Sequence, residues 1–142
     1  MLRILAIDYG TKKCGIAVSD PLRLIATGLA TVPTWQLFDW LARYLQEERV
    51  GDVVVGESFH HDGAPNVLHQ EVIGFERKFA KRYPEITLHR QDEYRTSQRA
   101  IEAMLEMGVP KMKRREKGRV DKLAATLILQ DFMEALNRDR NQ

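Results

Sequence analysis

The first twenty residues constrain the fold more than any other part of the chain. A hydrophobic run ends in Asp8, passes through a turn that holds Gly10 and Gly15, and returns as a second hydrophobic run. This pattern predicts two strands, at about 2–8 and 14–19, joined as a hairpin. Because alternate residues of a strand share a face, Asp8 should continue a row of core residues.

A carboxylate in such a row is costly to bury unless a cation lies against it. A metal ion, or a phosphate held through one, would account for Asp8. The simpler alternative is that Asp8 only begins the turn, where aspartate is a favoured residue. Lys12 and Lys13 follow at once, between the two glycines, and this favours the functional interpretation.

The chain has 142 residues, of which 44% are hydrophobic and 30% charged, and these values are typical of one globular domain. We expect that domain to span 1–137 and to be followed by a polar tail, 138–142. The formal net charge is only +2, so an anionic partner must be attracted by local patches. Cys14 is the single cysteine, which excludes an internal disulfide, and we expect it to be buried. Met1 leads directly into the first strand, so a cytoplasmic protein without a membrane segment is expected.

The remaining pattern alternates between strands and helices. Thr34 is expected to cap a helix that contains Trp35 and Trp40, two residues for which core packing is favoured over base stacking. The other predicted elements are a third strand at 24–32 antiparallel to the second, a buried strand at 53–55, a helix over 68–79, a strand at 86–90, a helix at 100–105 and a last helix from 120. This order predicts an α/β fold of three layers around a five-stranded mixed sheet.

Several carboxylates are expected at one edge of that sheet. Ligands of parallel sheets bind at the carboxyl ends of the strands. Asp8 and Glu57 end two of the predicted strands, the pair Asp92-Glu93 follows a third, and Asp121 begins the last helix. Together with one or two hard cations, Mg²⁺ or Mn²⁺, they would form an oxygen-ligand site for phosphodiester hydrolysis. Individually, Asp121 could serve only the helix dipole and Glu93 could be a solvated loop residue.

A basic segment precedes Asp121. It contains Lys111, Lys113, Arg114, Arg115, Lys117 and Arg119. A charge run is often only a solvated face, but next to the carboxylates it would contact a phosphate backbone, as would Lys12 and Lys13 in the first turn. His60 and His61 are expected to face water.

Four motifs resemble those of the YqgF/RuvX family, Holliday-junction resolvases also assigned to 5′ processing of pre-16S rRNA. The residues that match are Asp8, Gly10, Lys12, Gly15 and Ala17; Val55, Gly56, Asp62 and Gly63; Asp92 and Glu93 of a modified motif over Asp92–Ser97; and Lys117, Gly118, Arg119, Asp121, Ala124 and Ala125. The resemblance spans nearly the whole chain. It implies a ribonuclease-H-like fold and a nuclease whose metal-binding acids are Asp8, Glu93 and Asp121.

The chain departs from the family pattern at two places. Tyr94 stands where the family has arginine, so that Arg95 is the neighbouring candidate for a phosphate contact. Glu57 and Ser58 replace Leu-Pro, and resolvases similar to RuvC carry an acid on that strand. Glu57 and Glu93 are therefore both candidates for the second catalytic and metal-binding acid.

Other functions compete with a nuclease of structured RNA. The resemblance equally allows a resolvase of branched DNA, which would act as a homodimer rather than a monomer to cut two strands symmetrically. A non-catalytic nucleic-acid-binding factor in ribosome assembly would keep the basic segment and tolerate loss of the acids. The segment Asp8–Thr11 is also similar to a phosphate motif of actin-like ATP-binding proteins, but 142 residues leave no room for their second domain.

Overall fold

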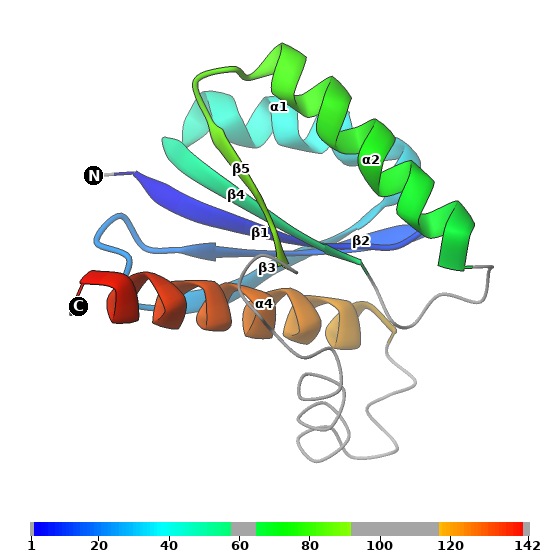
Figure 1. The fold of residues 1–142 in the computed structure, drawn as a ribbon. Coiled ribbons are helices and arrows are strands. Elements are labelled where there is room, and N and C mark those ends of the chain that lie inside the picture. Colours follow the sequence, from blue (N-terminus) through cyan, green and yellow to red (C-terminus); the bar gives the residue numbers. More distant parts are fainter. Residues whose placement is uncertain (1, 58–64, 92–116, 141–142) are drawn as a thin grey trace.

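The computed structural model describes residues 2–57, 65–91 and 117–140, which form three layers with a sheet between helices (Figure 1). The strands are β1 Arg3–Tyr9, β2 Lys13–Ser19, β3 Ala26–Pro33, β4 Val50–Glu57 and β5 Thr87–Arg90. The helices are α1 Leu37–Glu47, α2 Pro65–Arg82 and α4 Lys117–Arg140, with a short 3₁₀ helix, η1, at Thr34–Gln36. The predicted α/β class is confirmed.

The sheet has the strand order β3-β2-β1-β4-β5. β1 and β2 form the predicted antiparallel hairpin, β3 is antiparallel to β2, and β4 and β5 run parallel to β1. The mixed five-stranded sheet is therefore confirmed. Its register places Asp8 beside Gly56 and Tyr9 beside Glu57, so the carboxyl ends of β1 and β4 are neighbours.

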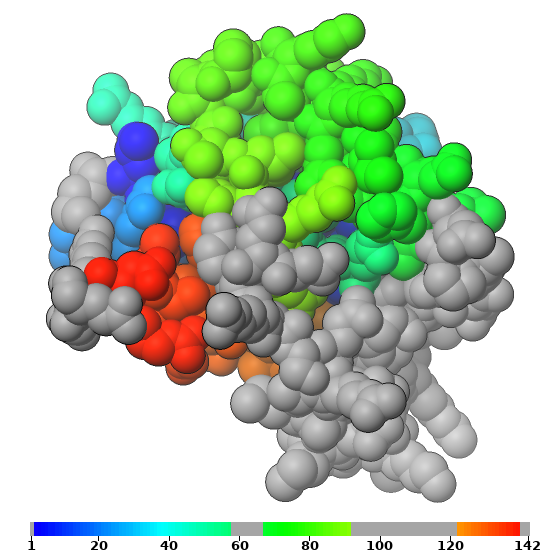
Figure 2. Space-filling view, viewed as in Figure 1, coloured from blue at the N-terminus to red at the C-terminus, as the bar shows by residue number. Residues whose placement is uncertain are grey.

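Helices α1 and α2 cover one face of the sheet (Figure 1). The apolar residues of α2 recur every three or four positions, so that one stripe of the helix is buried. That stripe consists of Leu68, Val72, Phe75 and Phe79, which pack with Leu5, Ile7, Val53 and Val55 of the central strands. Gly74 lies on the exposed side, where a Cβ would meet no atom within 4 Å. Figure 2 shows α2 and β5 in green over this side of the molecule.

Of the described helices, α4 covers the opposite face (Figure 1). Its buried residues include Ala124, Ala125, Ile128, Leu129 and Phe132. The small alanines allow the helix to approach the sheet closely. At β3 the approach is so close that a Cβ on Gly28 would lie 3.1 Å from Thr126 Oγ1.

The turn between β2 and β3 is tied to the amino ends of the central strands. Arg23, whose φ is 60°, donates from Nε to the Leu2 carbonyl at 2.7 Å and from Nη2 to Asp52 Oδ2 at 2.6 Å. Asp52 also pairs with His89 Nε2 at 2.8 Å. The hydrogen bond with His89, and then that with Arg23, lower the pKa of Asp52 below its ordinary value. The ring of His89 contacts Phe132 of α4, so this network joins the sheet to the helix.

Three local predictions were wrong. Thr34 does not cap α1, because its hydroxyl donates to the Gly10 carbonyl at 2.7 Å and α1 begins three residues later. Trp35 is 80% exposed rather than part of the core. α4 begins at Lys117 instead of 120, and it continues through most of the polar tail to Arg140.

Other predictions are confirmed or concern residues outside the described ranges. Cys14 is completely buried, and Trp40 packs against the core and stacks on Tyr44. The expected helix at 100–105 lies outside the described residues. In the described ranges, the helices are too short or too polar to span a bilayer.

Candidate active site

Asp8 is a buried carboxylate at the carboxyl edge of the sheet. It is 2% exposed and occupies the second-to-last position of β1. The residues before it in the same row, Ile4 and Ala6, belong to the core beneath α4. Directly beside it are Gly15 on β2 and Gly56 on β4. Because neither glycine has a side chain, the space on both sides of the carboxylate is left to groups from other elements.

Gln91 fills the space above Gly56. A Cβ on Gly56 would collide with Gln91 Oε1 and would lie 2.8 Å from Ile128 Cδ1. Gln91 follows β5 and is 4% exposed, and its Nε2 forms no hydrogen bond within the described part of the chain. Buried polar groups are normally paired, so this edge is a place where a further polar group belongs. Sequence reasoning missed Gln91, although it lies two residues after His89 and alternate residues of a strand share a face.

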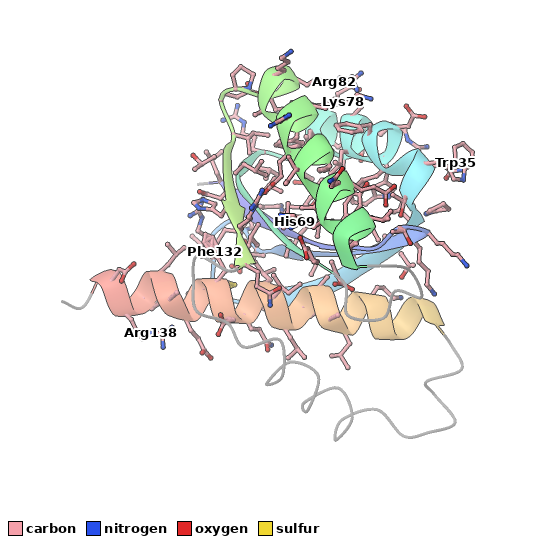
Figure 3. All side chains as sticks on the ribbon, turned by 45° about the vertical axis from the view of Figure 1, so that its right-hand side comes forward. Trp35, His69, Lys78, Arg82, Phe132 and Arg138 are labelled. Atoms are coloured by element: carbon pink, nitrogen blue, oxygen red, sulfur yellow. The ribbon has the colours of Figure 1, made fainter. Side chains whose placement is uncertain are left out.

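Glu57 lies on the other face of the sheet. It follows Val53 and Val55 in the row that packs beneath α2, and its Oε1 is 2.5 Å from Nδ1 of His69 on that helix. Figure 3 labels His69 on α2. The structure therefore does not bring Glu57 together with Asp8, and this geometry does not favour Glu57 as a ligand of an ion held by Asp8.

Tyr9 follows Asp8 directly, is in register with Glu57 and points to the α2 side. Its ring meets Phe75 edge to face, with centroids 5.5 Å apart. Burial, together with Cys14 and Glu71, raises the pKa of Tyr9 far above its usual range. The phenol thus stays neutral and serves as part of the core rather than as an acid or base near neutral pH.

Asp121 lies in the first turns of α4, of which the structure describes the backbone. It precedes Ala124 and Ala125, which are fully buried against the sheet, by three and four positions. Residues with that spacing share a helix face. Lys117 and Arg119 belong to the same first turns, so part of the predicted basic loop is helical.

The remaining predicted residues lie outside the described ranges. They are Glu93, Asp92, Arg95, Lys111, Lys113, Arg114, Arg115, His60 and His61. Within residues 2–57, 65–91 and the described side chains of α4, no three histidines, cysteines or acids gather at one point. Of the predicted acids, the structure thus fixes the carboxylates of Asp8 and Glu57 only.

Lys12 and Lys13 belong to the turn that follows Asp8. Lys12 is exposed, and Lys13 begins β2 in register with Pro33. The backbone N–H of Thr34 donates to the Lys12 carbonyl at 2.9 Å, which brings Trp35 to the same end of the sheet. The side chain of Trp35 projects outward there (Figure 3).

Comparison with known proteins agrees with this arrangement. Residues 2–135 match the family model described as "RuvX: Holliday junction resolvase". The chain belongs to the RuvX family. The matched region includes β1 with Asp8 and the first turns of α4 with Asp121.

Relatives of this RuvX chain are similar over nearly their full length. A protein of Christiangramia forsetii is 44% identical over 133 residues, which are 94% of this chain and 98% of the relative. A protein of Flavobacterium johnsoniae is 41% identical over 95% of this chain and 98% of its own length. A third, from Porphyromonas gingivalis, is 42% identical over 99% of this chain and its own full length. All three are named "Putative pre-16S rRNA nuclease".

Proposed function

We propose that this RuvX chain is a nuclease that hydrolyses phosphodiester bonds of structured nucleic acid with the help of Mg²⁺ or Mn²⁺. The observation that carries the proposal is the buried carboxylate of Asp8 at the carboxyl edge of the sheet. The description of the chain's family and the names of its relatives, which refer to a resolvase and to nucleases, support it. A carboxylate in a hydrophobic row is costly to bury, and a hard cation offsets that cost. Asp8 therefore fits the donor chemistry of a divalent ion.

Asp121 and Glu93 are proposed as the further acids. Asp121 precedes, on one helix face, the alanines that lie against the sheet, and Glu93 follows β5 by three residues. A divalent ion held by these acids would supply positive charge to the attacking and leaving oxygens of a phosphodiester. Lys12, with the basic segment before and within the start of α4, would hold the phosphate backbone across the same edge.

The proposed substrate is the 5′ end of pre-16S rRNA, as the names of the relatives suggest. The family description favours a second candidate, a four-way DNA junction. Both are branched or folded nucleic acids with closely spaced phosphates, so the same basic surface serves either. A cytoplasmic protein would meet both.

The test is cleavage by the purified protein of a pre-rRNA leader and a four-way junction, side by side, with Mg²⁺, Mn²⁺ or a chelator. We expect metal-dependent cleavage of the leader by the native protein and none by Asp8→Asn. Cleavage of the junction alone would support the resolvase. If the native protein binds but cuts neither substrate with either metal, a non-catalytic assembly factor replaces the proposal.

A further inference from the structure

Trp35 is exposed to an extent that its size makes unusual. Its exposed fraction is 80%, whereas tryptophan in folded proteins is highly buried on average. The other tryptophan, Trp40, packs against the core, and its ring stacks on Tyr44 with centroids 5.1 Å apart. Figure 3 shows Trp35 projecting into solvent at the end of the molecule where α4 begins.

The exposed indole is carried by a fixed piece of backbone. Thr34 donates from its N–H to the Lys12 carbonyl at 2.9 Å and from its hydroxyl to the Gly10 carbonyl at 2.7 Å. Pro33, one residue earlier, pairs with Lys13. Gly10 follows Asp8 by two residues, a strand distance of roughly 7 Å. Trp35 is thus anchored to the turn that leads out of the candidate active site.

The surroundings of Trp35 favour a nucleic acid over an apolar protein surface. Lys12 is exposed in the turn that Thr34 binds. The exposed apolar cluster of Leu22, Leu24 and Ile25 follows the other end of β2. An exposed indole one residue from the backbone bond to Lys12 matches the pairing of stacking platform and phosphate contact found where proteins bind single strands.

We propose that Trp35 stacks on one unpaired base of the substrate while Lys12 contacts a neighbouring phosphate. This inference rests on the proposed function and adds to it a substrate feature: a single-stranded stretch adjoining the bond that is cut. A base inside a duplex has both faces covered by its neighbours, so Trp35 selects single-stranded segments. Because every base has a π-face, the selection is tolerant of sequence.

Binding is tested on the Asp8→Asn background, so that no cleavage intervenes. Trp40→Phe leaves Trp35 as the single tryptophan of a chain that has two. With this double variant, a short single-stranded RNA should quench the fluorescence of Trp35. A blunt duplex of the same sequence should not. Absence of quenching at saturating single-stranded RNA would overturn the stacking proposal.

Affinity and salt dependence separate stacking from charge. Trp35→Ala should weaken binding of the single strand about tenfold at every salt concentration, and Trp35→Phe should restore part of the loss. Lys12→Ala should instead flatten the salt dependence, by roughly 0.7 for one contact on a single strand. The matched control is Trp40→Phe, which should bind like the native protein. Equal affinities of Trp35→Ala and the native protein would contradict the proposal.

The outcome is independent of the nuclease test. If the native protein cuts nothing and Trp35 is still quenched by single strands, the nuclease proposal fails and stacking stands. If cleavage is normal in Trp35→Ala and no quenching occurs, stacking fails and the nuclease stands. Melting temperatures should be unchanged in all Trp35 variants, because the side chain is exposed.

Discussion

Asp8 and Glu57 lie at the carboxyl ends of neighbouring strands but one residue apart in register, and this offset places their carboxylates on opposite faces of the sheet. Asp8 is in register with Gly56, and Glu57 is in register with Tyr9. Successive side chains of a strand alternate between faces. Asp8 therefore belongs to the α4 side, whereas Glu57 meets His69 on the α2 side. Proximity along the sheet edge does not by itself make two acids partners.

Asp8→Asn is expected to abolish metal-dependent cleavage and to leave the fold intact. Asparagine keeps the shape of the buried side chain and removes the charge that would hold the cation. The measurement is single-turnover cleavage together with the melting temperature. A purely structural Asp8 would show the reverse, a lowered melting temperature with normal turnover.

Glu93→Gln is expected to reduce cleavage far more than Glu57→Gln does. Glu57 is committed to His69 on the far face of the sheet, so loss of its charge should change turnover less than about twofold. Comparing cleavage rates of the two variants at saturating Mg²⁺ checks this. A strong loss from Glu57→Gln alone would make Glu57 the second acid and require the end of β4 to rearrange when metal binds.

Gly56→Ala is expected to lower both the stability of the protein and its cleavage activity. The added Cβ would displace Gln91 and press on Ile128, and such overpacking costs about 1–3 kcal/mol. Chemical denaturation should show this loss, and cleavage should fall because Gly56 lies directly beside Asp8. The matched control is Gly74→Ala in the exposed side of α2, which should stabilise the protein by about 0.5–1 kcal/mol. Equal stability and activity of Gly56→Ala and the native protein would contradict the close packing of Gln91.

Asp52 should make stability depend on pH in the acid range. Its pKa is lowered in the folded state by His89 and Arg23, so its contribution is present above the unfolded pKa of about 3.9 and is lost as the pH falls through the folded value. Asp52→Asn should lower the free energy of unfolding by about 2 kcal/mol at pH 7. The difference from the native protein should shrink below about pH 4. Glu48→Gln, which removes one charge from the more exposed pair of Glu48 with Arg3, is the control and should change the stability less.

Replacing Lys113, Arg114 and Arg115 with alanine should weaken binding of different nucleic acids about equally. Phosphate contacts carry no sequence information. The salt dependence of the binding constant should flatten by up to roughly 0.9 per lost contact on duplex DNA. Titrations between low and moderate salt would measure it. An unchanged slope would show that these three cations face solvent in the complex.

The sequence predicted the architecture well because the architecture depends on periodic patterns. Alternation in the first hairpin and the apolar stretch in β4 identified central strands, and parallel pairing of β1 with β4 followed from the intervening helix. The face to which each edge residue points was harder, since it depends on register. A single step separates Gly56 from Glu57, and only the pairing with Asp8 shows which of the two shares its face.

Trp35 and Thr34 were misjudged for a related reason. A threonine after proline is typical of a helix cap, and a tryptophan near a helix start is typically buried. Here the Thr34 hydroxyl is taken by the Gly10 carbonyl, a residue 24 positions away in the sequence. Thr34 thus begins η1 instead of capping α1, and Trp35 within η1 is exposed. Local propensity contains no information about such a distant acceptor.

The central position of β1 has a consequence for how the protein loses its activity. β1 is hydrogen-bonded to a strand on each side, and its residues Leu5 and Ile7 belong to one core while Ile4 and Ala6 belong to the other. Amide hydrogens along this strand should exchange with solvent only when the whole domain unfolds. Fraying of β3 or β5 at the sheet margins leaves the carboxylate of Asp8 in place. Heat inactivation should therefore be cooperative, because Asp8 is displaced only when the whole domain unfolds.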